Sequence, residues 1–292
     1  MPIEKDKILD TTIKLFYENN KDAITLGQLS CALNTSITTL KKYLNKYSKE
    51  DNNFILPDCF HVLHKTLCHF DYLTEENSYW LGYLMADGCY TCNSRNREGM
   101  RLMLECKSDD KEILEKFCDF LSIRHSRITI GHHGKSVALS LSDNNFSTSV
   151  SEWGITKNKS HTENHVPKEI LSNDAFFFQY LRGIIDGDGT IHTYKYSPGV
   201  SFVSNSEAFC LEIKRKLELM LPVPSSIWLR KLDKEKQSKH ATQSIYSLKI
   251  GTGGGGIHKG ANSTFLFHKM YDNQPVILTR KYLSFCTLVG KQ

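Results

Sequence analysis

The sequence predicts an α+β fold built from two pseudo-twofold repeats, preceded by a small all-α domain. The first observation is a stretch that occurs twice, as WLGYLMADG over residues 80–88 and as LRGIIDGDG over residues 181–189. The second is an alternating pattern after each copy, which is typical of antiparallel strands. Because an internal repeat constrains a fold more than a single local pattern does, we expect two αββαββα units that form a saddle of antiparallel sheet.

The first 48 residues predict the all-α domain, in which three short amphipathic segments follow one another. Two short helices joined by a turn at Asn34, the second rich in Ser, Thr and Lys, are typical of a helix-turn-helix. Such a unit places the start of its second helix against base edges in the major groove. The candidate DNA-contacting residues are Ser36, Thr38, Thr39, Lys41 and Lys42. A packing or oligomerisation module is the alternative.

Residues 49–71 are predicted to be a linker, because a polar run opens them and Pro57 prevents a continuous helix. The repeats then occupy residues 72–172 and 173–292. In the first repeat we expect strands at 89–94, 100–106, 126–131 and 136–141, with helices from Ser108 and over 146–153. In the second we expect strands at 190–196, 200–204, 226–232 and 244–250, with helices from Ser206 and over 265–271.

The two repeated stretches each begin as an apolar helix, which is shorter than the about 20 residues that a membrane span requires. A glycine inside a helix costs roughly 1 kcal/mol relative to alanine unless a second backbone must come close. We therefore expect the two helices to pack together at Gly82 and Gly183. Asp87 and Asp188 then meet at the end of the seam.

The two stretches resemble the LAGLIDADG motif of homing endonucleases, in the single-chain form with two motifs. This resemblance implies a monomeric, site-specific DNA endonuclease that makes a staggered double-strand break in a long, partly asymmetric target. It implies two or three Mg²⁺ ions at the repeat interface, bound by Asp87 and Asp188 with help from the backbone carbonyls of Ala86 and Gly187. The usual acidic residue two places before the metal-binding Asp is present as Asp186 but replaced by Met85 in the first motif. We expect cleavage to survive this change, with two unequal centres.

Two further segments resemble the same family and supply basic residues, which offset charge in the transition state. GITKNKS over residues 154–160 is similar to the GIxPNKS segment and offers Lys159. LTRKYLSF over residues 278–285 is similar to the LxRKYxxF segment and offers Lys281, with Arg280 as the alternative. For each of these segments, a surface lysine after a helix is the competing interpretation.

Basic residues also gather on the predicted strands and their turns. A two-stranded ribbon fits the major groove, where Arg and Lys read guanine or bind phosphate. The candidates are Arg95, Arg97, Arg101, Lys107 and Lys135 in the first repeat, and Lys195, Arg230, Lys231, Lys234, Lys236 and Lys239 in the second, with His132, His133 and His240 among them. The alternative is that these charges only solvate the strands and discourage edge pairing.

The bulk composition agrees with an intracellular protein, cytoplasmic or nucleoid-associated. The formal charge of +5 permits a polyanionic partner, nine cysteines fit a reducing compartment, and neither a leader nor a membrane span is expected. Two other functions remain open at this point. One is a non-cleaving DNA-binding transcriptional regulator with a LAGLIDADG-like domain. The other is an RNA maturase, which would require an RNA-binding surface that the sequence does not identify.

Overall fold

The computed structural model describes Leu40, Tyr43 and residues 70–292, except 93–99, 132–133, 158, 233–243, 254–259, 273, 275 and 291–292. Contacts divide the chain into Met1–His69 with Cys118–Arg124, and Phe70–Phe117 with His125–Gln292. The predicted helix-turn-helix and most of the linker, including Ser36, Thr38, Thr39, Lys41 and Lys42, lie outside the described residues.

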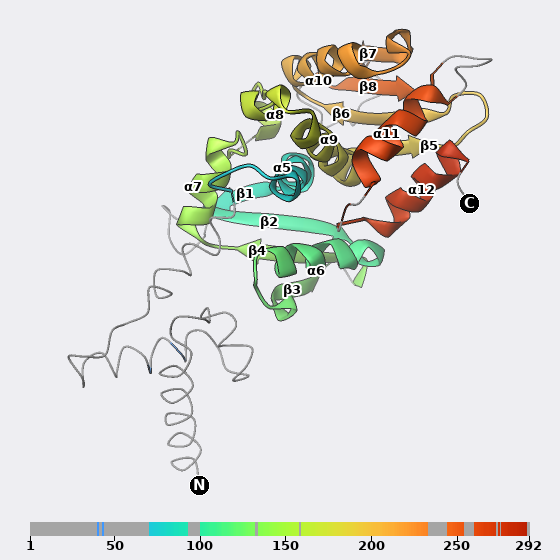
Figure 1. Cartoon of the computed structure of the whole chain (residues 1–292). Helices are drawn as coiled ribbons and strands as arrows, with labels where there is room; N and C mark the ends of the chain where they lie inside the picture. Colours follow the sequence, from blue (N-terminus) through green and yellow to red (C-terminus); the bar gives the residue numbers. More distant parts are fainter. Residues whose placement is uncertain are drawn as a thin grey trace. The chain divides into compact units, whose positions relative to one another are not determined.

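The two predicted repeats are present, each with the order αββαββα (Figure 1). The first comprises α5 (Glu75–Asp87), β1 (Cys89–Cys92), β2 (Met100–Lys107), α6 (Lys111–Phe120), β3 (Ile128–Gly131), β4 (Ser136–Leu141) and α7 (Asn144–Glu152). The second comprises α9 (Asp174–Asp188), β5 (Thr190–His192), β6 (Gly199–Ser204), α10 (Glu207–Met220), β7 (Ile227–Lys231), β8 (Tyr246–Gly251) and α11 (Ala261–Tyr271). Two helices outside this pattern are α8 (Lys168–Ser172) and α12 (Thr279–Val289).

Each repeat contains one four-stranded antiparallel sheet, in the orders β1-β2-β4-β3 and β5-β6-β8-β7. Strand alternation gives each sheet one buried face and one open face. Leu102, Leu139 and Leu141 are buried in the first sheet, and Phe202 and Leu248 are buried in the second. The fold class predicted from the sequence is therefore confirmed for this part of the chain.

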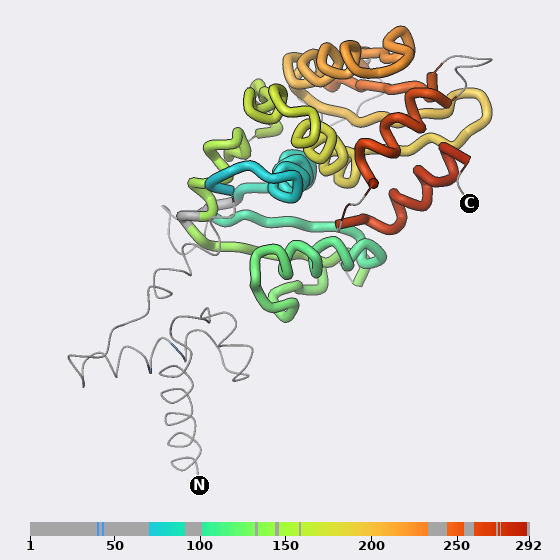
Figure 2. Tube along the Cα trace, in the orientation of Figure 1, coloured from blue at the N-terminus to red at the C-terminus, as the bar shows by residue number. Residues whose placement is uncertain are grey.

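Helices α5 and α9 lie side by side at the junction of the repeats, where the tube in Figure 2 shows the blue and yellow-green traces crossing closely. Their backbones touch at the two mid-helix glycines. A Cβ atom on Gly82 would lie 2.0 Å from the carbonyl oxygen of Tyr180, and one on Gly183 would lie 2.1 Å from that of Tyr79. No side chain fits at either position, which confirms the predicted packing.

Both seam helices begin at a side-chain cap, which defines where each helix starts. The Thr74 hydroxyl accepts a hydrogen bond from the Asn77 amide at 3.1 Å. The Asn173 side chain accepts one from the Ala175 amide at 2.9 Å. Among the described residues, no helix is long and apolar enough to cross a membrane.

Candidate active site at the helix seam

Helices α5 and α9 end at Asp87 and Asp188, and the two ends are in contact. A Cβ atom on Gly187 would lie 2.5 Å from the Ala86 Cβ and 3.2 Å from the Asp87 Oδ2. Burial, and then the nearby Asp188 carboxylate, raise the pKa of Asp87 to about 6. The two acidic side chains therefore lie close enough at the end of the seam to repel each other.

The two carboxylates differ in their surroundings. The Tyr83 hydroxyl, one helical turn before Asp87, hydrogen-bonds to the Asp87 carboxylate. The corresponding residue of α9 is Ile184, which has no hydroxyl. Asp188 is the more exposed of the pair. Partial burial raises the pKa of Asp188, and the ammonium groups of Lys159 and Lys281 oppose that shift.

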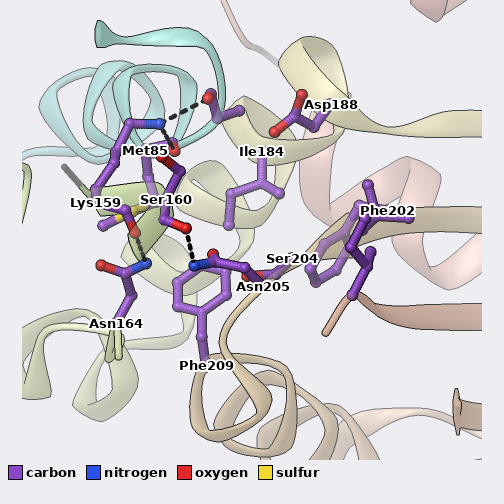
Figure 3. A pocket seen from close by; sticks show the side chains of 13 residues that line it. Met85, Lys159, Ser160, Asn164, Ile184, Asp188, Phe202, Ser204, Asn205 and Phe209 are labelled. Atoms are coloured by element: carbon purple, nitrogen blue, oxygen red, sulfur yellow. Dashed lines mark hydrogen bonds between the residues drawn. The ribbon is translucent and has the colours of Figure 1, made fainter. Parts of the chain in front are cut away.

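Lys159 lies in the 3-10 turn Lys159–His161, which follows α7. Its Nζ donates to the carbonyl oxygen of Ala86 at 2.7 Å and to that of Met85. Burial lowers the pKa of Lys159, and the carboxylates of Asp188 and Asp87 oppose that shift. Lys159, Ala86 and Asp188 line one pocket of about 240 Å³ (Figure 3).

Lys281 lies in the first turn of α12 and is only 6% exposed. Its Nζ donates to the carbonyl oxygen of Gly189, the residue after Asp188. Burial and Arg280 lower the pKa of Lys281, whereas Asp186, Asp110 and Asp87 oppose that shift. The alternative candidate, Arg280, instead forms a two-point ion pair with Asp110, with Nε–Oδ1 at 3.0 Å and Nη2–Oδ2 at 2.7 Å.

Asp186 serves a different purpose from Asp188. Its Oδ2 accepts a hydrogen bond from the Tyr79 hydroxyl of α5 at 2.9 Å, and it is only 2% exposed. The buried Arg182 guanidinium lies 4.3 Å from the Tyr79 ring centroid and donates to the Val276 carbonyl oxygen at 2.5 Å. This network joins α9 to α5 and to the segment before α12. Met85 occupies the position of Asp186 in α5, so α5 lacks the carboxylate on which this network depends.

The donor set at the seam fits Mg²⁺, the cofactor expected from the sequence. Mg²⁺ takes oxygen ligands and keeps several of its waters, so one or two carboxylates per ion suffice. Asp87 and Asp188 supply such carboxylates, and Ala86 supplies a carbonyl that Lys159 contacts in this structure. Over the described part of the chain, no three His, Cys, Asp or Glu residues gather as a denser metal site.

The open faces of the sheets hold part of the predicted DNA-contacting set. Arg101 and Lys107 lie on the open face of β2, and Arg230 lies on that of β7. Lys135 and Lys195 are exposed in turns beside the strands. The candidates outside the described residues are Arg95, Arg97, His132, His133, Lys234, Lys236, Lys239 and His240.

Lys231 is placed differently from the sequence expectation. Its strand register pairs it with Tyr246, and its Nζ lies 5.8 Å from that ring centroid. Tyr246 hydrogen-bonds to Glu207 of α10, so this is the face that the helix covers. Neighbouring residues of a strand point to opposite faces, and Arg230 is therefore the open-face residue of the two.

Sequence reasoning missed three residues of the open face in the second repeat. Trp228 is 52% exposed and pairs with Lys249 of β8, which in turn pairs with Ser201 of β6. His192 lies on the same face of β5 and hydrogen-bonds to the Ser201 hydroxyl at 2.7 Å. The signal for Lys249 was the alternation Leu248-Lys249-Ile250, in which a charged residue separates two apolar ones.

No family model matches the chain, and no curated protein sequence does either. Among solved structures, similar ones are LAGLIDADG homing endonucleases. The meganuclease I-AabMI bound to uncleaved DNA shares 12% identity, with 75% of this chain and 91% of that chain covered and a TM-score of 0.43. I-WcaI bound to its DNA recognition sequence shares 12%, covering 80% and 97%, with a TM-score of 0.45. A variant of I-DmoI with its target DNA in the presence of Mg shares 14%, covering 72% and 99%, with a TM-score of 0.44. These identities are too low to carry an activity over to this chain.

Proposed function

We propose that this protein is a Mg²⁺-dependent, site-specific DNA endonuclease that cuts both strands of a long, partly asymmetric target. The observation that carries this proposal is the convergence of Asp87 and Asp188, one from each repeat, with Lys159 and Lys281 beside them. A structural role alone would not require two neighbouring acidic residues whose burial opposes their ionisation.

We propose that the site contains two centres, each of which combines both repeats. One centre consists of Asp188, the Ala86 carbonyl and Lys159, which line a common pocket. The other would consist of Asp87, Gly187 and Lys281. Gly187 packs against Asp87, and Lys281 donates to a backbone carbonyl at the end of α9 as Lys159 does at the end of α5. Asp87 and Asp188 would hold the ions, with the carbonyls of Ala86 and Gly187 as additional ligands. Two such centres account for two strand cuts.

Hydrolysis of a phosphodiester requires an activated water, a stabilised pentavalent phosphorus and a leaving oxygen relieved of charge. Bound Mg²⁺ would supply a more acidic water and a counter-charge for the phosphate oxygens. Lys159 and Lys281 place positive charge beside the carboxylates, where negative charge develops in the transition state. The Tyr83 hydroxyl holds the Asp87 carboxylate in one orientation, as outer-shell partners of metal ligands do.

The open faces of the two sheets are proposed as the DNA-binding surface. Arg101 and Lys107 in the first sheet, and Arg230 and Lys249 in the second, would contact phosphates and guanine edges. The predicted helix-turn-helix over residues 1–48 would add contacts outside this surface. Since the chain carries both repeats, we propose that it acts as a monomer.

The test is to incubate the purified protein with a library of DNA that includes the sequence flanking its own gene, with and without Mg²⁺. We expect a double-strand cut with staggered ends at one sequence, which EDTA abolishes. Asp188→Asn should abolish double-strand cleavage while binding to the same fragment persists in Ca²⁺. Binding without any cut, identical for Asp188→Asn, would instead identify a DNA-binding regulator.

A further inference from the structure

The helix that carries Lys281 does not provide its own N-terminal cap. The first amide groups of a helix have no partner inside it and require one from elsewhere. Leu278 precedes α12 and offers no side-chain cap. Glu112 of α6, in the first repeat, accepts from the Thr279 amide at 2.8 Å and from the Thr279 hydroxyl at 3.0 Å. One repeat therefore caps a helix of the other.

Two more side chains from the same part of the first repeat hold the residues on either side of Thr279. Lys116 Nζ donates to the Ile277 carbonyl oxygen. Asp110 accepts both hydrogen bonds of the Arg280 ion pair, a geometry that fixes orientation as well as distance. Burial raises the pKa of Glu112, but the hydrogen bonds from Thr279 outweigh it and hold the pKa below its ordinary value. Lys281 immediately follows this held segment.

The segment that carries Lys159 belongs to the first repeat and is held by residues of the second. Asn205, between β6 and α10 of the second repeat, donates from its side-chain amide to the Ser160 carbonyl oxygen at 2.5 Å (Figure 3). The Ser206 hydroxyl accepts from the Asn164 amide at 3.1 Å and donates to the Asn164 carbonyl oxygen at 2.8 Å. Asn164 in turn donates to the Lys159 carbonyl oxygen at 2.7 Å.

We call the residues that hold each lysine segment a brace. The two braces occupy equivalent places in the two repeats. Helices α6 and α10 each follow the first hairpin of their repeat, and residues within or just before each helix hold the lysine segment of the other repeat. From this arrangement we infer that the lysines are positioned reciprocally. Asp110, Glu112 and Lys116 are positioning residues for Lys281, and Asn205 and Ser206 are positioning residues for Lys159. This inference rests on the proposed nuclease function.

If the lysines are positioned reciprocally, each brace affects cleavage of one strand only. A displacement of about 1 Å at a reacting group costs on the order of 100-fold in rate. Loss of one brace therefore slows the centre that contains the corresponding lysine and leaves the other centre intact. The product is then a nick in one defined strand, which general destabilisation of the fold would not give.

The experiment compares strand-specific rates on a supercoiled plasmid that contains the target. We expect Glu112→Ala, which removes both acceptor oxygens, to slow, by about 10- to 100-fold, the same strand that Lys281→Met slows. Asn205→Ala should slow the other strand, the one affected by Lys159→Met. The matched control is Glu115→Ala, since Glu115 lies on the same helix and pairs with Lys111 of that helix at 2.7 Å. Equal slowing of both strands by Glu112→Ala, or no slowing, would overturn the inference.

A second readout does not depend on catalysis. Hydrogen–deuterium exchange of the metal-free protein should increase over residues 277–284 in Glu112→Ala and over 159–164 in Asn205→Ala, with neither variant affecting the other segment. Unchanged exchange in both variants would contradict the bracing contacts. If the unmodified protein does not cut DNA, the proposed function fails, while the exchange measurement still decides whether the braces exist.

Discussion

At the scale of single residues, the surroundings of Asp87 disfavour the charged form of its carboxylate. Burial and Asp188 raise its pKa to about 6, whereas an aspartate in an unfolded chain titrates near 3.9. The folded protein therefore binds the proton more tightly than the unfolded chain does. Stability from this group is present at low pH and is lost as the pH rises from about 4 to about 6.

Asp87→Asn should accordingly stabilise the metal-free protein at pH 7.5. The neutral amide removes the repulsion, and we expect a gain on the order of 1–3 kcal/mol, which disappears near pH 4 where the native aspartate is protonated. Thermal unfolding in EDTA at both pH values measures this difference. A variant that is less stable than the native protein at pH 7.5 would show that the carboxylate supports the fold rather than opposing it.

The sequence predicted the central residues of the site because they belong to a repeated motif. Asp87 and Asp188 follow from the two copies, and their meeting follows from Gly82 and Gly183. The hydrogen bond that Asp87 receives from its own helix could not be predicted in the same way. Tyr83 and Ile184 are both apolar positions in a helical pattern, and only their three-dimensional surroundings show that one of them donates a hydrogen bond.

At the scale of elements, the seam depends on the absence of two side chains. A Cβ atom on Gly183 would lie 2.6 Å from the Tyr83 amide nitrogen in addition to its contact with the Tyr79 oxygen. Backbone atoms of a packed helix cannot move aside as the end of a flexible side chain does. The two helices would therefore have to separate, and the carboxylates at their ends would separate with them.

Gly183→Ala should destabilise the protein by about 3 kcal/mol or more, since the new methyl group overpacks the seam. Helix propensity alone predicts the opposite sign, a gain of up to about 1 kcal/mol. Chemical denaturation of the native protein, Gly183→Ala and Gly183→Ser distinguishes these outcomes, because a steric effect grows from Ala to Ser. Stabilisation by Ala would mean that the helices are not in contact at Gly183.

The order of elements within the two repeats was predicted correctly, whereas some boundaries and the helices α8 and α12 were not. The strand expected over 190–196 ends at His192 as β5, and the residues up to Pro198 form an exposed turn. The helix expected over 265–271 begins earlier, at Ala261. The sequence identified the region of α12 as a motif but did not predict that it forms a helix. Its start depends on Glu112, which is distant in sequence, so no local pattern marks it.

At the scale of the whole described unit, the two repeats share one site but present separate sheet faces. The sequence shows that the strands carry basic residues. The strand register is needed to assign each basic side chain to one face of the sheet. The register of β7 and β8 separates Arg230 from its neighbour Lys231 and adds Lys249 to the open face. The sequence therefore predicted that these strands are basic but not which side chains face a partner.

This division gives a test of the proposed DNA-binding surface with a built-in control. Each phosphate contact contributes about 0.9 to the slope of log K against log salt concentration. Arg230→Gln and Lys249→Gln should each reduce this slope by up to that amount, whereas Lys231→Gln should leave it unchanged because Lys231 lies on the α10 side of the sheet. Fluorescence anisotropy with a labelled duplex in Ca²⁺, over a series of salt concentrations, measures the slope without cleavage. A larger effect from Lys231→Gln than from Arg230→Gln would place the DNA on the opposite face.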